Sequence, residues 1–571
     1  MNDERPHLTR CPICESRRLR YAFSHKDHRI VRCGDCQLLF LNPQPSNDEL
    51  AAIYTADYFL YAGDEESRPR VDETKRETAR LYLAEIQRYF GAPGGRLLEV
   101  GCGDGNFLVE AEAAGFDVAG VEYSSAACDN ARSRIRGEIY CGEIESQSLA
   151  EGQFDLCVLS DVIEHVRDPI RFLQAVHRLL KPGGGIFLTT CSLDSWSAKF
   201  LRQDWMEFKT EHLVYFDRRT LQTALLKAGF NEVVVQSGWK CLSFDYVARH
   251  FECYEVPLVT PIMRLLGKIL PQFMQRKIHK VVASGVMVFA RKAAVPEQKK
   301  LSVIMPAYNE APTFTKVVDA VLQKKLADLE VELVIVESNS TDGTRELAEH
   351  YREHPRVKLI LEDKPRGKGH AVRAGLQAGS GDYILIQDAD LEYDLEDYDA
   401  LLEPLMTGRE AFVLGSRHSG NVWKMRQFSG QAGLSALLNL GHWFFTALVN
   451  VLFVQHLKDP FTMFKVFRRD CLFGLTFECN RFDFDYELLI KLIRKGYRPL
   501  ELPVNYRSRS FKQGKKVSMV RDPLTWLRAL VKLRLAKVDP LAEVERRRLS
   551  MQDGKVQPGE PIVAAQKALC L

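Results

Sequence analysis

The chain has little of what would assign it to a simple class. Its net charge is only +3 over 571 residues, so electrostatic attraction to nucleic acid is not indicated. Its N-terminus has no apolar stretch of the kind that a secretory signal requires. The fourteen cysteines are therefore expected as reduced thiols in the cytoplasm rather than as disulfides.

Charged side chains are also missing from one long stretch. Residues 427–455 contain no Asp, Glu, Lys or Arg, and residues 434–454 are long enough to span a bilayer. Asn439, His442 and Asn450 interrupt this stretch, and such groups would be costly against lipid. Interfacial helices with one face on a membrane surface are favoured, and a buried helical pair is the alternative.

Two alternating series of apolar runs and amphipathic stretches divide the chain. The first extends from Arg96 to about Thr190 and the second begins at Leu301, and such alternation is typical of α/β folds with parallel sheets. We expect a zinc-binding segment at residues 1–45, a first domain at 46–292, a linker at 293–300, a second domain at 301–540 and a polar, disordered tail at 541–571.

Four cysteines near the N-terminus have the spacing of a metal site. Cys11 and Cys14 form one Cys-x-x-Cys pair and Cys33 and Cys36 form the other, with eighteen residues between them. Four thiolates can close a tetrahedral shell around Zn²⁺ with no position left for water, so a structural zinc is predicted. Two disulfides or a redox motif are the alternatives.

A glycine-rich turn follows the first predicted strand of the first domain. Gly101, Gly103 and Gly105 come directly after Leu97–Val100, and glycine lets the backbone approach a ligand closely. Such a turn alone would suit NAD equally well. The next predicted strand, however, ends in an acid, Glu122.

These residues, with segments 154–165 and 180–190, resemble a class I S-adenosylmethionine-dependent methyltransferase over about residues 49–291. The segment 31–45 also resembles the zinc-binding leader of some bacterial members. The resemblance implies that Glu99 faces the methionine amino group and that Glu122 accepts from the ribose hydroxyls. It also implies a cofactor site formed by the following residues: Glu99, Gly101, Gly103, Gly105, Glu122, Asp155 and Ser160.

The methyl acceptor is less closely defined. The segment Glu211–Phe216 resembles that of family members in which a histidine near the acceptor acts as a base, and an unperturbed histidine titrates near neutrality. His212 is the predicted base, with a structural hydrogen-bonding role as the alternative, and the structural role is favoured for His165. Methylation of an oxygen on a sugar or small hydroxyl compound is predicted, with carbon or nitrogen left open.

An aspartate pair follows a strand of the second series. Asp388 and Asp390 come after the apolar run Tyr383–Gln387. Two carboxylates at the end of a strand can bind Mg²⁺ or Mn²⁺, which would bridge a diphosphate and neutralise the leaving group. Three other motifs accompany the pair: Val303–Glu310, Val336–Thr344 and Lys364–Ala371.

Together these motifs resemble a family 2 glycosyltransferase of the polyprenyl-phosphate branch, such as dolichyl-phosphate mannose synthase, over about residues 301–535. The resemblance implies a GT-A fold, and with the first domain it gives two Rossmann-like doubly wound sheets. Glu337 stands where the family more often has aspartate, which leaves the base open. The resemblance implies the following sugar-nucleotide contacts: Pro306, Tyr308, Glu310, Glu337, Asn339, Lys368, Asp388, Arg509 and Lys515.

The acceptor decides whether the second domain needs a base. A polyprenyl phosphate is already ionised and needs none. For a hydroxyl acceptor, Asp485 or Glu487 is the candidate base, and a salt-bridge role is the alternative for each.

The sequence therefore predicts a bifunctional cytoplasmic enzyme, peripheral at the inner face of the membrane. One half transfers methyl groups from S-adenosylmethionine. The other transfers sugar from a nucleoside-diphosphate sugar to a glycan or polyprenyl-phosphate acceptor in surface polysaccharide or glycolipid assembly. The alternatives are an inactive S-adenosylmethionine-binding module that regulates the second half, and a zinc ribbon that docks a partner protein.

Overall fold

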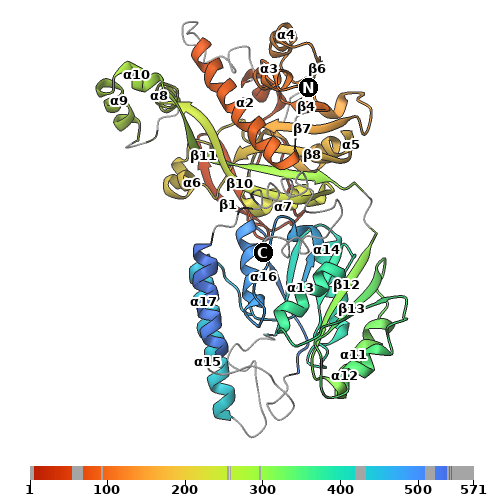
Figure 1. The fold of residues 1–571 in the computed structure, drawn as a ribbon. Coiled ribbons are helices and arrows are strands. Elements are labelled where there is room, and N and C mark those ends of the chain that lie inside the picture. The colour runs from red at the N-terminus through yellow and green to blue at the C-terminus, as the bar shows by residue number, and fades with distance from the viewer. Residues whose placement is uncertain are drawn as a thin grey trace. The chain divides into compact units, whose positions relative to one another are not determined.

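The computed structural model describes residues 5–53, 68–91, 94–253, 256, 259–294, 298–417, 432–507, 521–536, 539 and 542. The chain forms two compact units, residues 1–295 and 296–571 (Figure 1). Arg509, Lys515 and nearly all of the predicted tail lie outside the described residues.

A small antiparallel sheet at the start of the first unit carries the four cysteines. Its order is β1 (Leu19–His25), β2 (His28–Cys33), β3 (Leu39–Leu41) and β9 (Val214–Tyr215). Strand β9 comes from far along the chain and pairs with β3. The sheet that carries the cysteines is thus completed by a strand from the domain that follows it, which sequence spacing alone did not indicate.

The main sheet of the first unit has seven strands in the order β10-β11-β8-β7-β4-β5-β6. Its strands are β4 (Arg96–Val100), β5 (Asp117–Glu122), β6 (Glu138–Cys141), β7 (Phe154–Ser160), β8 (Leu180–Cys191), β10 (Phe230–Ser243) and β11 (Ile278–Lys292). Strands β4 to β8 are mutually parallel, and β11 is antiparallel to both β8 and β10. The predicted α/β fold is confirmed for this unit.

The helices of the first unit form two groups along the chain. The first group is α1 (Asn47–Ile53), α2 (Arg68–Phe90), α3 (Asn106–Ala113), α4 (Ser125–Arg134), α5 (Pro169–Leu179), α6 (Trp196–Leu201) and α7 (Arg218–Lys227). The helices α8 (Phe244–Cys253), α9 (Val259–Ile269) and α10 (Gln272–Arg276) come between β10 and β11 and group at the far end of these two long strands (Figure 1).

One observation differs from the expectation of reduced thiols. Helix α4 and strand β6 bring Cys128 and Cys141 to a Cα separation of 6.2 Å, and the two form a disulfide. The two cysteines are 13 positions apart in the sequence, so a search for closely spaced cysteine motifs does not reveal this pairing.

The second unit contains another seven-stranded sheet, in the order β14-β13-β12-β15-β17-β16-β18. Its strands are β12 (Lys300–Ala307), β13 (Glu330–Glu337), β14 (Val357–Leu361), β15 (Tyr383–Ile386), β16 (Phe412–Ser416), β17 (Lys465–Arg468) and β18 (Leu500–Pro503). Strands β12 to β15 are parallel, whereas β17 is antiparallel to its neighbours β15 and β16. The four parallel strands have the positions that the sequence predicts.

The helices of the second unit are α11 (Ala311–Gln323), α12 (Thr344–Glu349), α13 (Lys368–Ala378), α14 (Tyr398–Met406), α15 (Ala432–Phe453), α16 (Phe484–Lys495) and α17 (Arg521–Leu535). Along α15 the polar residues Asn439 and His442 are buried. Leu440, Trp443 and Phe444 are instead 52–54% exposed. Over the described residues, no helix combines the length and hydropathy needed to cross a bilayer.

A buried acid joins the amino ends of strands β12, β13 and β15. Glu332 accepts hydrogen bonds from the Ser302 hydroxyl and from the main-chain N–H of Ser380 and Gly381. Burial alone would raise the pKa of Glu332, but these donors and Lys358 lower it to about 2. Glu332 therefore stabilises the folded second unit only while its carboxyl group is ionised.

We predict that Glu332→Gln lowers the stability of the second unit by on the order of 3 kcal/mol at pH 7. Because the folded pKa lies below the unfolded value of about 4.5, this contribution is lost as the pH falls from about 4.5 toward 2. The gap in unfolding temperature between wild type and variant should therefore narrow between pH 7 and pH 3 in calorimetry. Glu330→Gln, an exposed acid on the same strand, is the control. A gap that stays constant with pH would contradict this account.

Candidate active sites

The four cysteines of the small sheet lie together. Cys11 Sγ is 3.5 Å from Cys36 Sγ, and Cys14 Sγ is 3.4 Å from Cys33 Sγ. All four sulfurs lie within 4.8 Å of one another. Sulfurs around a tetrahedral zinc with bonds of about 2.3 Å stand about 3.8 Å apart, so the cluster fits Zn²⁺.

The two cysteine turns are built alike. The N–H of Glu15 donates to the carbonyl of Cys11 at 3.0 Å, and the N–H of Gln37 donates to the carbonyl of Cys33 at 3.2 Å. Both Glu15 and Gln37 have positive φ, 61° and 67°. Each turn thus closes four residues after its first cysteine and brings two sulfurs to the same side.

The glycine turn after β4 is held by an acid from the next strand. Gly101, Gly103 and Gly105 all have positive φ, which side chains other than glycine rarely adopt. Glu122, at the end of β5, accepts from Gly103 N–H at 2.8 Å and from Ser124 N–H at 2.9 Å. The predicted ribose-binding acid therefore also fixes the turn beside which the ligand would lie.

A second acid near this turn has an unsatisfied atom. Glu99 is 3% exposed, and within the described residues its Oε2 has no hydrogen-bond partner. Burial, and then the charge of Glu122, raise the pKa of Glu99 well above its usual range. Burying a carboxylate without a partner is costly, so this position fits a ligand that brings donors and positive charge. The methionine ammonium and sulfonium of S-adenosylmethionine would supply both.

The structure separates two residues that the sequence assigns to this site. Ser160 ends strand β7, at the same edge as the glycine turn. Asp155 lies at the opposite end of β7, where it accepts from Arg96 N–H and pairs with Lys181 Nζ, each at 2.8 Å. The prediction of Asp155 as a cofactor ligand is therefore wrong, because its carboxylate links the amino ends of neighbouring strands.

His212, the predicted base, lies in a buried group on the same edge. Its ring centroid is 4.7 Å from that of His165, and its Nδ1 donates to the Glu207 carbonyl at 2.8 Å. Burial, and then the charges of His165 and Lys209, lower the pKa of His212 well below 6.5. The assumption of an unperturbed histidine is therefore wrong, and His212 is a neutral imidazole near pH 7.

In the second unit, the predicted nucleotide residues lie at the carboxyl edge of the parallel strands. Pro306 is within β12, and Tyr308 and Glu310 follow it. Glu337 ends β13, is fully buried and accepts from Ser340 N–H at 2.6 Å. Asn339 follows with a φ of 56°. Because β12 and β13 are parallel neighbours, all of these residues lie at one edge.

Three carboxylates gather around a lysine at this edge. Lys368, the first residue of α13, lies 2.5 Å from Asp388. Burial alone would lower the pKa of Lys368, but the charges of Asp388, Asp485 and Asp390 outweigh it and raise the pKa. Asp390 is 5% exposed. A second ammonium, that of the buried Lys465, is 3.4 Å from Asp485.

Comparison with models of protein families gives two matches along the chain. A model described as a methyltransferase domain matches residues 74–236, and one described as glycosyl transferase family 2 matches residues 302–472. The chain belongs to the family 2 glycosyltransferases and carries a methyltransferase domain. It is therefore a transferase, and the methyltransferase fold supports S-adenosylmethionine as the cofactor of its first unit.

Curated relatives match the glycosyltransferase unit. Two dolichyl-phosphate beta-glucosyltransferases of Trichomonas vaginalis are each 30% identical over 37% of this chain and 65% and 67% of their own lengths. The dolichol-phosphate mannosyltransferase of Pyrococcus furiosus is 27% identical over 37% of this chain and 57% of its own length. The chain thus spans about two-thirds or less of these three relatives.

One solved structure similar to the methyltransferase unit is a SAM-dependent methyltransferase of Thermotoga maritima. It is 21% identical, and the match covers 39% of this chain and 91% of that one with a TM-score of 0.28.

Glu487, a predicted base of the glycosyltransferase unit, has a structural role. It is 2% exposed, accepts from the N–H of Glu478 and Cys479 at 3.0 and 2.8 Å, and pairs with Lys491 at 2.6 Å. Its carboxylate thus holds a loop against α16, and the alternative role of salt-bridge partner applies to it. Asp485, two residues earlier, instead belongs to the carboxylate group around Lys368.

The structure adds buried residues that the sequence analysis did not select as site residues. Arg417, just after β16, forms two hydrogen bonds of 2.7 Å with the carboxylate of Asp459, and both side chains are almost fully buried. Burial alone would raise the pKa of Asp459, but Arg417 outweighs it and holds that pKa far below its usual range. Both residues stand within segments that resemble the family, which was the signal available to find them.

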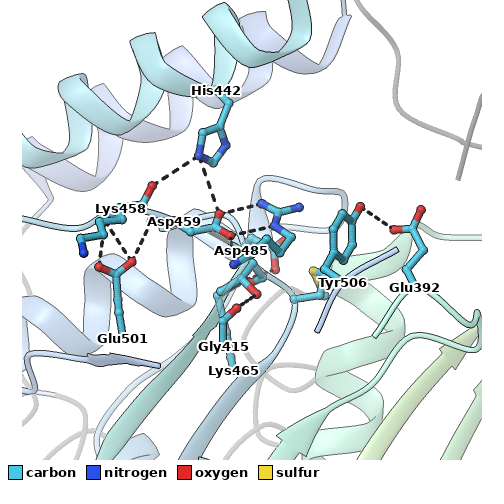
Figure 2. Close-up of polar contacts among 12 residues, drawn as sticks. Glu392, Gly415, His442, Lys458, Asp459, Lys465, Asp485, Glu501 and Tyr506 are labelled. Carbon is cyan, nitrogen blue, oxygen red and sulfur yellow. Dashed lines mark hydrogen bonds and ion pairs between the residues drawn. The ribbon is translucent and has the colours of Figure 1, made fainter. Parts of the chain in front are cut away.

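Helix α15 contributes to this pair. Figure 2 shows His442 reaching from the helix toward the loop of Lys458 and Asp459. His442 Nε2 lies 3.8 Å from Asp459 Oδ1 and 3.4 Å from the Lys458 carbonyl. Glu501, on β18, accepts from the N–H of Asp459 at 2.7 Å. The histidine that interrupts the uncharged stretch therefore links α15 to the loop that carries Asp459.

We predict that Cys33→Ser abolishes zinc binding and lowers the unfolding temperature of the methyltransferase unit by about 5 °C or more. The reason is that three thiolates no longer close the shell that joins the two cysteine turns. Elemental mass spectrometry would give the zinc content and calorimetry the unfolding temperature. Cys241→Ser, which removes a half-buried thiol outside the cluster, is the control. A wild-type chain without zinc would contradict the prediction.

We also predict that Asp459→Asn destabilises the glycosyltransferase unit by about 3–5 kcal/mol, because it leaves the Arg417 guanidinium buried without its counter-charge. Glu403→Gln removes the partner of Arg409 in an exposed pair of the same unit and should cost less than about 1 kcal/mol. Denaturant unfolding of the two variants would measure the difference, and equal costs would contradict it.

Proposed function

We propose that the second unit transfers a sugar from a nucleoside-diphosphate sugar to a polyprenyl phosphate, and that the first unit methylates a hydroxyl of a sugar or related compound. The observation that carries the first part is the group of Asp388, Asp390 and Asp485 around Lys368 at the carboxyl edge of β12 to β15. Three carboxylates and two ammonium groups together carry a net negative charge, which attracts a divalent cation.

The roles within the glycosyltransferase site follow from these positions. Asp388 and Asp390 would hold Mg²⁺ or Mn²⁺, and the ion would supply charge neutralisation to the diphosphate that leaves. Lys368 lies close enough to Asp388 to reach the same diphosphate. Glu337 and Asn339, at the end of β13, would receive the nucleoside. Arg509 and Lys515 remain proposed phosphate contacts outside the described residues.

A phosphate acceptor fits the chemistry better than a hydroxyl. Glu487 is bound to the main chain and Lys491, and Asp485 is engaged by Lys465. Neither acid is therefore well placed as a strong base, and an ionised phosphate needs none. The names of three relatives also contain dolichyl or dolichol phosphate.

Exposed apolar residues on α15 support an acceptor in the membrane. Leu440, Trp443, Phe444 and Val451 are 52–77% exposed, whereas Asn439, His442 and Thr446 of the same helix are buried. A helix that turns apolar side chains outward suits a bilayer surface. We therefore place the protein in the cytoplasm, in contact with the inner face of the membrane.

In the methyltransferase unit, Glu99, Glu122 and the glycine turn would bind S-adenosylmethionine. The glycines of the turn allow the ligand to approach the main chain closely. The unsatisfied oxygen of Glu99 would accept from the positively charged methionine part of the ligand. We place the acceptor hydroxyl beside His212, at the end of the sheet where Ser160 also lies. Sequential action of the two units on one glycolipid is the role that best explains their fusion.

Paired variants test whether each unit is active separately. Asp388→Asn with Asp390→Asn should reduce sugar transfer to a polyprenyl phosphate in detergent at least about 100-fold, since the metal is lost. The same variant should keep S-adenosylmethionine binding. Transfer of radiolabelled sugar, with a panel of uridine and guanosine diphosphate sugars, would measure the first effect.

Glu122→Gln should weaken S-adenosylmethionine binding at least about tenfold in calorimetry and leave sugar transfer unchanged. Strong binding without any methyl transfer to sugars or glycolipids would favour a regulatory module instead. If the wild type transfers sugar to a glycan but not to a polyprenyl phosphate, the proposed acceptor is contradicted.

A further inference from the structure

A second group of metal-binding side chains lies in the methyltransferase unit, apart from the four cysteines. Glu164, His165 and His212 each offer one ligand atom, and these atoms lie within 4.8 Å of one another. Glu164 and His212 are 1% and 5% exposed. Glu164 and His165 are neighbours in one loop and His212 comes from a distant segment, so the fold brings these ligand atoms together.

A hydrogen bond to a main-chain carbonyl fixes each of the two histidine rings. Nδ1 of His165 lies 3.0 Å from the Glu211 carbonyl, and Nδ1 of His212 lies 2.8 Å from the Glu207 carbonyl. Since a carbonyl only accepts, both Nδ1 atoms donate, and the lone pair of each neutral ring is on Nε2. Protein metal sites commonly orient their histidines by such a bond to a carbonyl.

The carboxylate of the group is oriented as well. The Thr190 hydroxyl donates to Glu164 Oε2 at 2.9 Å, and Thr190 belongs to the neighbouring strand β8. Glu164 and His165 follow strand β7 in a short 3-10 turn (η2, Ile163–His165). In the same loop, Val162 packs so closely on Gly101 that a Cβ there would lie 2.5 Å from its Cγ2. The group therefore adjoins the glycine turn of the proposed cofactor site.

We propose that Glu164, His165 and His212 bind a divalent transition-metal ion, and that this ion binds the hydroxyl to be methylated. Two imidazoles and one carboxylate suit first-row divalent ions and leave coordination positions open. This proposal rests on the proposed methylation of a hydroxyl. It replaces the role of His212 as a base, because the Nε2 lone pair would bind the ion.

The reaction balances without a further reactant. A hydroxyl bound to a divalent ion ionises more readily, and its proton passes to water. The oxygen then forms a bond to the methyl carbon as the bond from that carbon to sulfur breaks. The products are the methyl ether and S-adenosylhomocysteine.

Binding of Mn²⁺ tests the proposal without an activity assay. The full-length chain carrying Asp388→Asn and Asp390→Asn, loaded with zinc, removes the competing carboxylates of the glycosyltransferase site. Titration followed by electron paramagnetic resonance should give one bound Mn²⁺ per chain. Glu164→Gln or His212→Gln, added to this background, should weaken binding at least tenfold, whereas His177→Gln, on α5 of the same unit, should not.

Two results would overturn the proposal. One is no Mn²⁺ binding by the Asp388→Asn and Asp390→Asn chain, a measurement that does not depend on whether the buried-site variants fold. The other is equal binding after Glu164→Gln in a chain with unchanged thermal unfolding. If the chain that gives either result still binds S-adenosylmethionine, only the proposed metal site is contradicted. If the Asp388→Asn and Asp390→Asn chain does not bind S-adenosylmethionine, the proposed function itself is contradicted.

A different surface of the same unit carries an independent inference. On α9 and α10, the apolar side chains of Ile262, Leu265, Ile269, Phe273 and Met274 are 48–74% exposed. The first three recur at helical spacing, which places them on one face of α9. Exposed apolar groups gathered in this way mark a contact surface.

The charged side chains on α9 and α10 themselves have one sign. Lys268, Arg276 and Lys277 are exposed, and residues 256–292 contain no Asp or Glu. Helices α8 to α10 lie beyond the far end of β10 and β11 (Figure 1). We infer that α9 and α10 dock on an anionic lipid bilayer, with the apolar side chains in the interface and the basic ones among the headgroups.

Vesicle sedimentation of the full-length chain tests this inference. Ile269→Ser with Phe273→Ser should weaken binding to phosphatidylcholine vesicles containing one-quarter phosphatidylglycerol at least about fivefold. Phe200→Ser, which removes an 84% exposed side chain on α6, is the control and should have no effect. Lys268→Glu should weaken binding only to the anionic vesicles. Equal vesicle binding by all variants would overturn the inference. It would also be overturned if the wild type formed dimers and the Ile269→Ser and Phe273→Ser chain did not, because the surface would then be a protein interface.

Discussion

An excess of buried carboxylates over cations at the carboxyl edge of each sheet is the constraint on which the rest of this structure depends. In the glycosyltransferase unit, three aspartates share the ammonium groups of Lys368 and Lys465. In the methyltransferase unit, burial raises the pKa of both Glu99 and Glu122. Taking a carboxylate out of water is costly unless charge or donors replace the water. Under the proposed function, a metal-bridged diphosphate and a sulfonium nucleoside supply that positive charge.

The fold creates these edges at some local cost. Parallel strands end together, so the loops that follow them converge, and several non-glycine residues in those loops adopt positive φ. Asp161, Asn309 and Asn339 all do so, at 52–56°. Each is held by a specific bond, for instance the one from Thr341 N–H to Asn309 Oδ1 at 2.9 Å. Strain that is retained where ligands would bind agrees with a site built for function rather than for stability.

Much of this arrangement could be predicted from the sequence, because it depends on short segments. The glycine turn, the acid after β5 and the aspartate pair after β15 each follow an apolar run, and the run and the turn lie within a few residues. Interactions between distant segments could not be predicted in this way. The bond between Arg417 and Asp459 joins residues 42 positions apart, and β9 completes a sheet that starts near the N-terminus. The motif around Asp155 indicates a strand but not which end of it faces a ligand, and Asp155 lies at the amino end of β7.

The measurement that tests the central claim most directly is proton release when S-adenosylmethionine binds. Calorimetric titrations near pH 6 in two buffers with different ionisation enthalpies would count the protons. Because the pKa of the Glu99 carboxyl is raised in the free protein, binding of the cation should ionise it and release protons to the buffer. The account predicts an enthalpy that depends on the buffer in the wild type and much less so in Glu99→Gln. Tight binding to the wild type with an enthalpy independent of the buffer would contradict it.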